Sequence, residues 1–192
     1  LSLRICGHYD AYYPGMINSS LVVAGCILHD IGKCEELDFR RKTRYSTSGR
    51  LVGHIPTGAA WVDQYAAQCE ETLAPDLILQ LKHLVLSHHG KLEYGSPITP
   101  KTPEALVLHE VDMIDSRLNM CWNLRASNHN QEAWSEYSRA LDGPMFFRGP
   151  SSWESPRRYD LQDLTGPGSV HADAADSLNG PQNLDLFGNH KS

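Results

Sequence analysis

The stretch LVVAGCILHD, residues 21–30, is apolar as far as Leu28 and then ends on His29 and Asp30, two groups that prefer water. A helix that is apolar on every side is normally buried on all sides. Gly32 follows closely and is placed to end this helix in the left-handed conformation. A histidine and an aspartate at the end of a buried helix need partners for their polar atoms. This stretch therefore predicts both a central helix and a polar site at its C-terminal end.

Five segments have the apolar spacing and the end signals of helices. They cover residues 1–13, 21–30, about 48–73, 75–89 and about 102–124. Ser19 or Ser20 can cap the second segment, and Pro56 either kinks the third or marks its true start. The basic stretch DFRRKTRYSTSGR, residues 38–50, is expected to be a loop. Because the sequence has no convincing strand and no internal repeat, it predicts an all-α fold.

The character of the chain changes near residue 142. Residues 142–192 are rich in Gly, Pro, Ser, Asp and Asn and show no sustained apolar period. Such a composition is typical of segments that do not pack into a core. We therefore expect a folded domain over residues 1–141 and an irregular, largely disordered tail over residues 142–192.

The composition limits the classes of function. The 192 residues carry a formal net charge of −6, which argues against a broad nucleic-acid-binding face but leaves room for a narrow basic groove. The five cysteines are widely spaced and form no CxxC pair, which suits a reducing cytoplasm better than a disulfide framework. No apolar stretch approaches the roughly 20 residues of a membrane span, so no membrane partner is expected. The composition leaves the oligomeric state open.

Histidines and acids gather at helix ends or on one helical face. The set consists of His29, Asp30, His54, His88, His89, Asp112 and Asp115. All lie in or beside apolar helical segments, where an unpaired polar group costs roughly a few kcal/mol. A bound metal removes that cost, and imidazole with carboxylate suits manganese, iron, nickel, cobalt or zinc better than magnesium. A helix cap or a surface position is the more common explanation for a single histidine, but several such clusters in one helical chain favour a metal site.

The members of this set are expected to have different roles. The predicted metal ligands are His29, Asp30, His54, His88 and Asp112. His89 and Asp115 are expected to support the ligands rather than to bind metal. His109, three residues before Asp112, is expected to be a core or supporting histidine. Lys33 fits a phosphate contact and a solvated cation at a helix end equally well.

The doublet His29-Asp30 with the downstream Asp112 resembles the HD-domain superfamily of metal-dependent phosphohydrolases. HDIGK, residues 29–33, also looks like the corresponding stretch of the HD-GYP cyclic-dinucleotide phosphodiesterases, in which the lysine meets phosphate. A more extended similarity, over about residues 1–125, is to the YhaM-type 3′-to-5′ exoribonucleases. The segments that carry it are AGCILHDIGKCEEL, GRLVGHI and LSHHGKLEYGSPITPKTPEALVLHEVDMIDSRL.

The resemblance implies a helical HD bundle with one or two divalent ions. Manganese is the expected ion, and iron, cobalt, nickel and magnesium are alternatives. Extra histidines such as His54 and His88 mark the two-metal members of the family. Asp30 is expected to bridge two ions and Lys33 to contact phosphate, so these two residues are expected to act in catalysis. The implied reaction removes nucleotides from the 3′ end of single-stranded RNA or DNA, by a water molecule activated between the metals.

Two departures from the family pattern leave alternatives open. In these relatives an OB-fold domain precedes the HD domain, and the first metal histidine lies just ahead of the part that matches residues 1–3. His8 lies further along the same helix and is a poor substitute. We expect that an N-terminal piece is missing, and that the 192-residue chain is weakly active or inactive without it. The other hypotheses are a non-catalytic HD module that binds nucleotide or a protein partner, and a small-nucleotide phosphohydrolase.

The tail contains one apolar cluster, within PQNLDLFGN, residues 181–189. Its sequence resembles the sliding-clamp-binding peptides of bacterial replication and repair proteins, with Asn183 where that pattern has glutamine. Leu184, Leu186 and Phe187 would anchor such a peptide to a clamp. The alternative is a tail that folds back, with these apolar side chains in a groove of its own domain.

Overall fold

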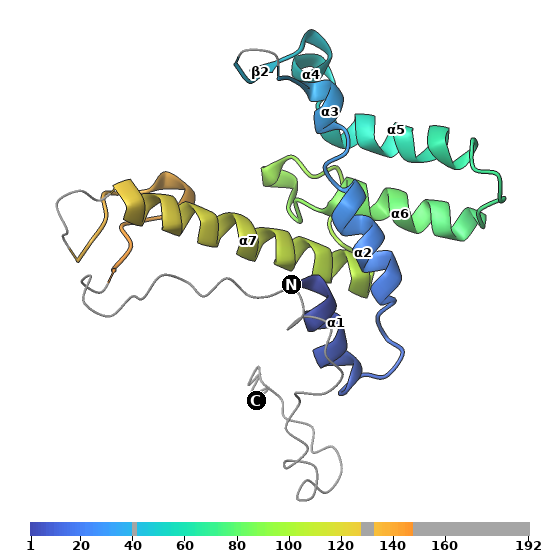
Figure 1. The fold of residues 1–192 in the computed structure, drawn as a ribbon, viewed down its shortest axis with the longest axis horizontal. Helices are drawn as coiled ribbons and strands as arrows, with labels where there is room; N and C mark the ends of the chain where they lie inside the picture. Colours follow the sequence, from blue (N-terminus) through green and yellow to red (C-terminus); the bar gives the residue numbers. More distant parts are fainter. Residues whose placement is uncertain (40–41, 128–132, 148–192) are drawn as a thin grey trace, which may run out of the picture. The chain divides into compact units, whose positions relative to one another are not determined.

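The structure, a computed structural model, describes residues 1–39, 42–127 and 133–147 and is mostly helical (Figure 1). Its α-helices are α1 (Ser2–Asp10), α2 (Ser19–Leu28), α3 (Lys33–Glu36), α4 (Thr47–Leu51), α5 (His54–Ala66), α6 (Pro75–Ser87) and α7 (Pro103–Ser127). Short 3₁₀ helices cover Leu92–Tyr94 and Arg139–Leu141, and the strands are β1 (Leu37–Asp38) and β2 (Arg44–Tyr45). The all-α class predicted from the sequence is confirmed.

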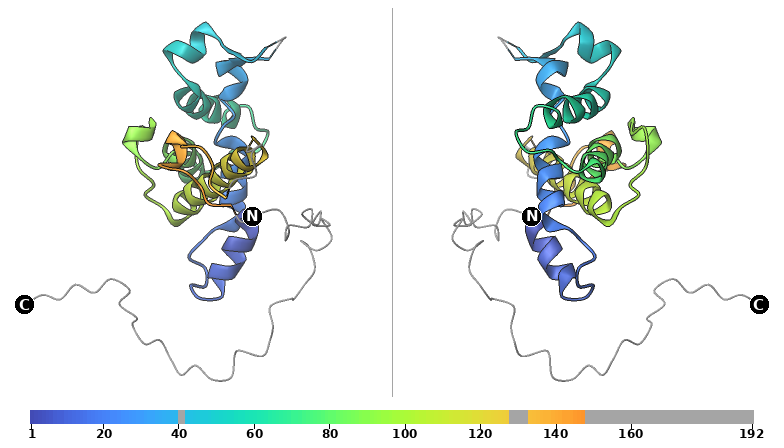
Figure 2. Two further views of the ribbon diagram at one scale, coloured as in Figure 1. Left: turned by 90° about the vertical axis from the view of Figure 1, so that its left-hand side faces the viewer. Right: turned by 90° about the vertical axis from the view of Figure 1, so that its right-hand side faces the viewer.

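Helix α2 is the centre of the fold, with α1, α6 and α7 packed around it (Figures 1 and 2). Its Leu21 joins Leu84, Ala105 and Leu108 in one buried core cluster. A Cβ atom on Gly25 would lie 2.8 Å from Leu84 Cδ1, so a larger residue there would force this side chain of α6 to shift. The expectation that α2 is buried on every side is wrong at one point, because Ile27 is 69% exposed.

The ends of α2 differ from their sequence predictions. Asn18, rather than Ser19 or Ser20, caps the helix, because its side chain accepts a hydrogen bond from Leu21 N at 3.1 Å. Gly32 has a φ of −63° and is the N-cap of α3, so it does not end α2 in the left-handed conformation. What requires glycine there is a close approach, since a Cβ atom on Gly32 would lie 2.0 Å from the backbone oxygen of His54.

The segment expected to be one helix from about 48 to 73 forms two helices instead. Helices α4 and α5 are separated at Gly53, whose φ of 81° favours glycine. Pro56 lies in the first turn of α5, where a proline costs no intrahelical hydrogen bond, so it marks a start rather than a kink. This break lets α5 begin at His54 and lie side by side with α6.

The basic stretch at residues 38–50 is not a loop throughout. Strands β1 and β2 pair antiparallel, with Leu37 opposite Tyr45 and Asp38 opposite Arg44. The expectation of no strands is therefore wrong for this hairpin, although each strand has only two residues. Lys42, Arg44 and Arg50 are exposed, whereas Arg40 and Arg41 lie outside the described residues.

Residues 133–147 form a small hairpin-like segment across the boundary expected near residue 142. Isolated β-bridges pair Trp134 with Phe146 and Ser138 with Gly143. The described residues up to Phe147 belong to one compact unit, so we place residues 143–147 with the domain rather than with the tail. The remaining tail, including the predicted clamp-binding residues Leu184, Leu186 and Phe187, lies outside the described residues.

Two further sequence expectations can be compared with the described residues. The five cysteines are all free thiols, as expected from their spacing. Among the described helices, none is both long and apolar enough to cross a membrane.

Candidate metal centre

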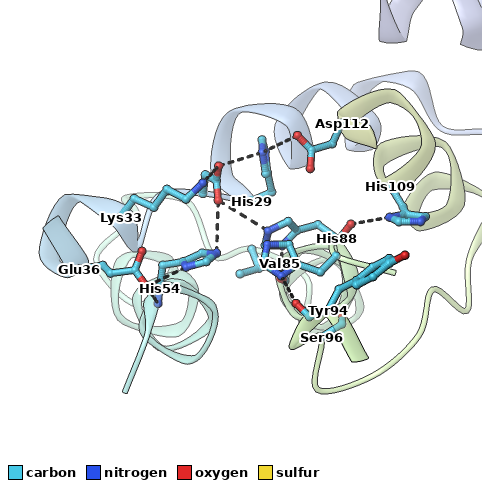
Figure 3. Close-up of polar contacts among 12 residues, drawn as sticks. His29, Lys33, Glu36, His54, Val85, His88, Tyr94, Ser96, His109 and Asp112 are labelled. Atoms are coloured by element: carbon cyan, nitrogen blue, oxygen red, sulfur yellow. Dashed lines mark hydrogen bonds and ion pairs between the residues drawn. The ribbon is translucent and has the colours of Figure 1, made fainter. Parts of the chain in front are cut away.

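Four separate helices bring the predicted ligands to one place (Figure 3). The five residues are His29 and Asp30 after α2, His54 at the start of α5, His88 after α6, and Asp112 within α7. Asp30 is the hub, with Oδ1 at 3.5 Å from His54 Nε2 and 3.6 Å from His88 Nε2. Its other oxygen, Oδ2, lies 3.4 Å from His29 Nε2, and Asp112 Oδ1 lies 3.8 Å from the same nitrogen. The structure therefore brings together all five residues that the sequence predicted as ligands.

The histidine rings are held so that Nε2 faces the cluster. The carbonyl oxygen of Cys26 lies 3.0 Å from His29 Nδ1, and that of Val85 lies 2.7 Å from His88 Nδ1. A carbonyl only accepts hydrogen bonds, so Nδ1 donates and carries the proton. In the neutral ring Nε2 then has a free lone pair, which is the state that a metal ligand needs.

Glu36 orients His54 and was not predicted from the sequence. Its Oε1 lies 3.0 Å from His54 Nδ1 and accepts a hydrogen bond from His54 N at 3.1 Å. The residue is 8% exposed, although it sits in a four-residue helix with an acidic neighbour, Glu35, that is exposed. A carboxylate on the far nitrogen of a ligand histidine fixes its tautomer and raises its basicity.

Three buried polar atoms of the cluster have no hydrogen-bond partner among the described residues. They are Asp30 Oδ1, His54 Nε2 and His88 Nε2. A buried polar group without a partner costs about 1–3 kcal/mol, so three that converge on one point require an explanation. One carboxylate oxygen and two imidazole nitrogens form a donor set that suits a divalent transition metal. The residues present therefore fit a bound cation.

Burial and neighbouring charges shift the pKa values of the cluster in different directions. Burial lowers the pKa of His88 to about 4, so this ring is neutral at pH 7. Burial acts to raise the pKa of Asp30, but hydrogen bonds from His29 and Lys33 and their charges outweigh it and hold the pKa well below its usual range. For His29, burial acts to lower the pKa, and the carboxylates of Asp30 and Asp112 outweigh it, so the net shift is upward. Asp30 is therefore an anion in the middle of the site.

His89 lies nearer to the cluster than its predicted supporting role requires. One ligand atom from each of His54, His88 and His89 can be chosen so that all three lie within 4.8 Å of one another. His89 Nδ1 lies 2.9 Å from the carbonyl oxygen of Tyr94, which leaves its Nε2 as a possible ligand atom. The adjacent pair of histidines at the end of an apolar helix was the only sequence signal for this arrangement.

The other singled-out histidines have different surroundings. His109 supports His88, because the His88 carbonyl oxygen lies 2.8 Å from His109 Nδ1. The ring of His109 fills the space beside Gly90, which has a φ of 77°. His8 is exposed on α1 and its ring contacts Tyr9 and Tyr12, each at 5.2 Å between ring centroids.

Asp115 lies away from the cluster, whereas Lys33 contacts it. Asp115 is exposed on α7 and does not line the cavity beside the cluster, so nothing in its placement supports the predicted supporting role. Lys33 is in contact with the cluster, since its Nζ lies 2.6 Å from Asp30 Oδ2. A cavity of about 880 Å³ adjoins the cluster and is lined by Asp30, Lys33, His89 and Asp112 at that end.

Comparisons with known proteins identify the family of the chain. The HD domain family model matches residues 1–117. The chain is 41% identical over 155 residues to the 3′-5′ exoribonuclease YhaM of Shouchella clausii, covering 80% of this chain and 47% of the relative. It is 46% identical over 136 residues to the protein of that name from Oceanobacillus iheyensis, a match that covers 71% of this chain and 42% of the relative. The protein of that name from Listeria monocytogenes is 42% identical over 145 residues, a match that covers 76% of this chain and 45% of the relative.

No solved structure matches the chain significantly. The chain spans less than half the length of these curated relatives. The family match covers every helix from α1 to α6 and the part of α7 that carries Asp112, and so includes all the residues of the cluster. The resemblance inferred from the motifs is confirmed: the chain belongs to the HD-domain family.

Proposed function

We propose that the chain is the HD part of a metal-dependent phosphodiesterase that removes nucleotides from the 3′ end of single-stranded RNA. The observation that carries this proposal is the convergence of three unpartnered buried atoms around Asp30. The relatives named 3′-5′ exoribonuclease favour RNA over DNA and over a small nucleotide as the substrate. The test is incubation of a 5′-labelled oligoribonucleotide with manganese and the chain extended at its N-terminus, which should shorten the RNA from its 3′ end. Internal cleavage would contradict the proposal, and so would cleavage that persists without metal.

We propose that the cluster holds two divalent ions, of which manganese is the expected one. His29, Asp30 and Asp112 would hold one ion, and Asp30, His54 and His88 would hold the other, with His89 available to it. When bound, such ions lower the pKa of a water molecule and offset negative charge on phosphate oxygens. Asp30 has an oxygen directed to each half of the cluster, which suits it to contact both ions.

The chain's own residues then orient the substrate and the ligands. Backbone carbonyls and Glu36 hold the histidine rings, so little reorganisation is needed when a cation binds. Lys33 lies at the edge of the cavity with 42% of its side chain exposed, where its ammonium can leave Asp30 for a phosphate oxygen. A positive charge held there favours the transition state, in which charge develops on phosphate.

Replacing Glu36 with glutamine is expected to weaken manganese binding by about 10- to 100-fold, because His54 loses the carboxylate that orients it. Calorimetric titration of the metal-free chain with manganese measures this. Glu35→Gln is the matched control, since Glu35 is exposed and accepts a hydrogen bond from Ser48 instead. Equal affinity of Glu36→Gln and the unchanged chain would show that Glu36 has no part in the metal site.

Replacing Lys33 with methionine is expected to lower the single-turnover rate of hydrolysis by about 100-fold while manganese binding is retained, because the lysine contacts phosphate rather than the ion. Lys82→Met is the matched control, because Lys82 also pairs with an aspartate, Asp63, at 2.5 Å. Single-turnover hydrolysis of the labelled oligoribonucleotide gives the rate, and calorimetry gives the metal affinity. An unchanged rate would show that Lys33 is a solvated cation at a helix end and does not contact phosphate.

A further inference from the structure

The cavity beside the cluster extends along α7, away from the metal ligands. Its lining on α7 begins at Asp112 and ends at Cys121, with Met113, Arg117 and Met120 between them. The nine residue-to-residue steps of α-helix from Asp112 to Cys121 correspond to about 13 Å along the axis. The volume, about 880 Å³, is in the range of pockets that hold one small organic ligand. A pocket of this length and size has room for a single nucleotide beyond the cluster.

The far wall of this cavity is the segment 133–147. Arg139, Asp142 and Met145 line it. The segment is internally bonded, since Met145 N donates to Ser135 Oγ at 2.9 Å and Ser135 N donates to the Met145 carbonyl at 2.8 Å. Ser135 is 8% exposed, so this wall has a small buried anchor of its own. The proposed hydrolytic centre does not use any of these residues.

The chemistry of the lining suits a nucleotide of any sequence. Met113, Met120 and Met145 offer flexible, polarisable surfaces that adapt to bases of different shape. Arg139 carries a planar guanidinium, which stacks on bases in many RNA-binding sites. Asp142 is a carboxylate that only accepts hydrogen bonds, and ribose hydroxyls are donors.

We propose that this cavity binds the 3′-terminal nucleotide of the RNA strand, and that the segment 133–147 makes the enzyme depend on a chain end. The inference rests on the proposed function, because it puts the 5′ phosphate of that nucleotide at the Asp30 cluster. Arg139 then stacks on the base, and Asp142 accepts hydrogen bonds from the terminal 2′ and 3′ hydroxyls. A strand that continued beyond this nucleotide would meet the wall, so internal phosphodiesters do not reach the cluster.

The test uses adenosine 5′-monophosphate as the probe, titrated into the manganese-loaded chain. Arg139→Ala is expected to weaken its binding about tenfold, the size of one lost stacking contact on a base. Asp142→Gly is expected to weaken it similarly, and glycine keeps the left-handed backbone at this residue, where φ is 60°. Arg4→Ala on α1, outside the cavity lining, is the control and should bind like the unchanged chain.

A second probe separates the two contacts and guards against a merely structural effect. 2′,3′-Dideoxyadenosine 5′-monophosphate lacks both hydroxyls, so Asp142→Gly should leave its binding unchanged while Arg139→Ala still weakens it. Unchanged affinity for adenosine 5′-monophosphate in both variants, with manganese still bound, would overturn this inference and leave the proposed function standing. Failure of the chain to bind manganese at all would overturn the proposed function instead.

Discussion

Replacing Asp30 with alanine is expected to abolish hydrolysis, lowering the rate by about 1,000-fold or more, while the chain stays folded. The carboxylate is the hub of the cluster and lies within 3.6 Å of three histidine nitrogens and of Lys33 Nζ. Without it, neither proposed ion keeps its full set of ligands. The fold depends on it less, because one of its oxygens has no hydrogen-bond partner among the described residues and its side chain is one-third exposed.

Hydrolysis of a 5′-labelled oligoribonucleotide by the N-terminally extended chain measures the rate, and urea denaturation measures the free energy of unfolding. The latter is expected to change by less than about 2 kcal/mol. Asp63→Ala is the control, since Asp63 pairs with Lys82 on the surface as Asp30 pairs with Lys33. Activity that survived Asp30→Ala would show that the assigned centre is not the site of chemistry.

Replacing Gly32 with alanine is expected to destabilise the domain by about 3 kcal/mol or more. The added Cβ would lie 2.0 Å from His54 O and 2.9 Å from Gly58 N, and backbone atoms cannot rotate away as a side chain can. Helix α5 must then move away from α3, and His54 moves with it. Manganese affinity should therefore fall together with stability.

Urea denaturation and manganese titration of the same variant measure both effects. The matched control is Gly7→Ala in α1, where an added Cβ meets no described atom within 4 Å. Alanine in a helix interior is about 1 kcal/mol more favourable than glycine, so the control should be neutral or stabilising. If Gly32→Ala and Gly7→Ala behaved alike, the close approach of Gly32 to His54 would not constrain the fold.

The helices were predictable because their apolar periodicity and end residues are local signals. Pro75 opens α6 and Pro103 opens α7, as expected for prolines in a first turn. The structural requirement for glycine at position 32 was not predictable from the sequence. A left-handed C-cap and a close approach between helices both require glycine. Only the position of His54 O, supplied by a different helix, distinguishes them. The two-residue strands β1 and β2 are too short to show a period of their own.

The site was predictable in part for the same reason. His29, Asp30, His54, His88 and Asp112 each sit at an apolar helix, so the sequence marks them as polar groups that need a partner. The sequence around Glu36 gives no such signal, because adjacent acids such as Glu35 and Glu36 are normally exposed to solvent. Only the tertiary packing of Glu36 against His54 buries it. The far wall formed by Arg139 and Asp142 was also not predicted, since it depends on a segment that returns to α7.

The central claim is that the cluster around Asp30 is a metal centre, and anomalous diffraction from crystals of the chain soaked in manganese tests it most directly. A peak is expected within about 2.0–2.5 Å of an Asp30 oxygen and of His54 Nε2 and His88 Nε2, with a second beside His29 and Asp112 when both ions are bound. If the crystals show manganese only at other places, or show the Asp30, His54 and His88 side chains directed away from one another, the account is contradicted.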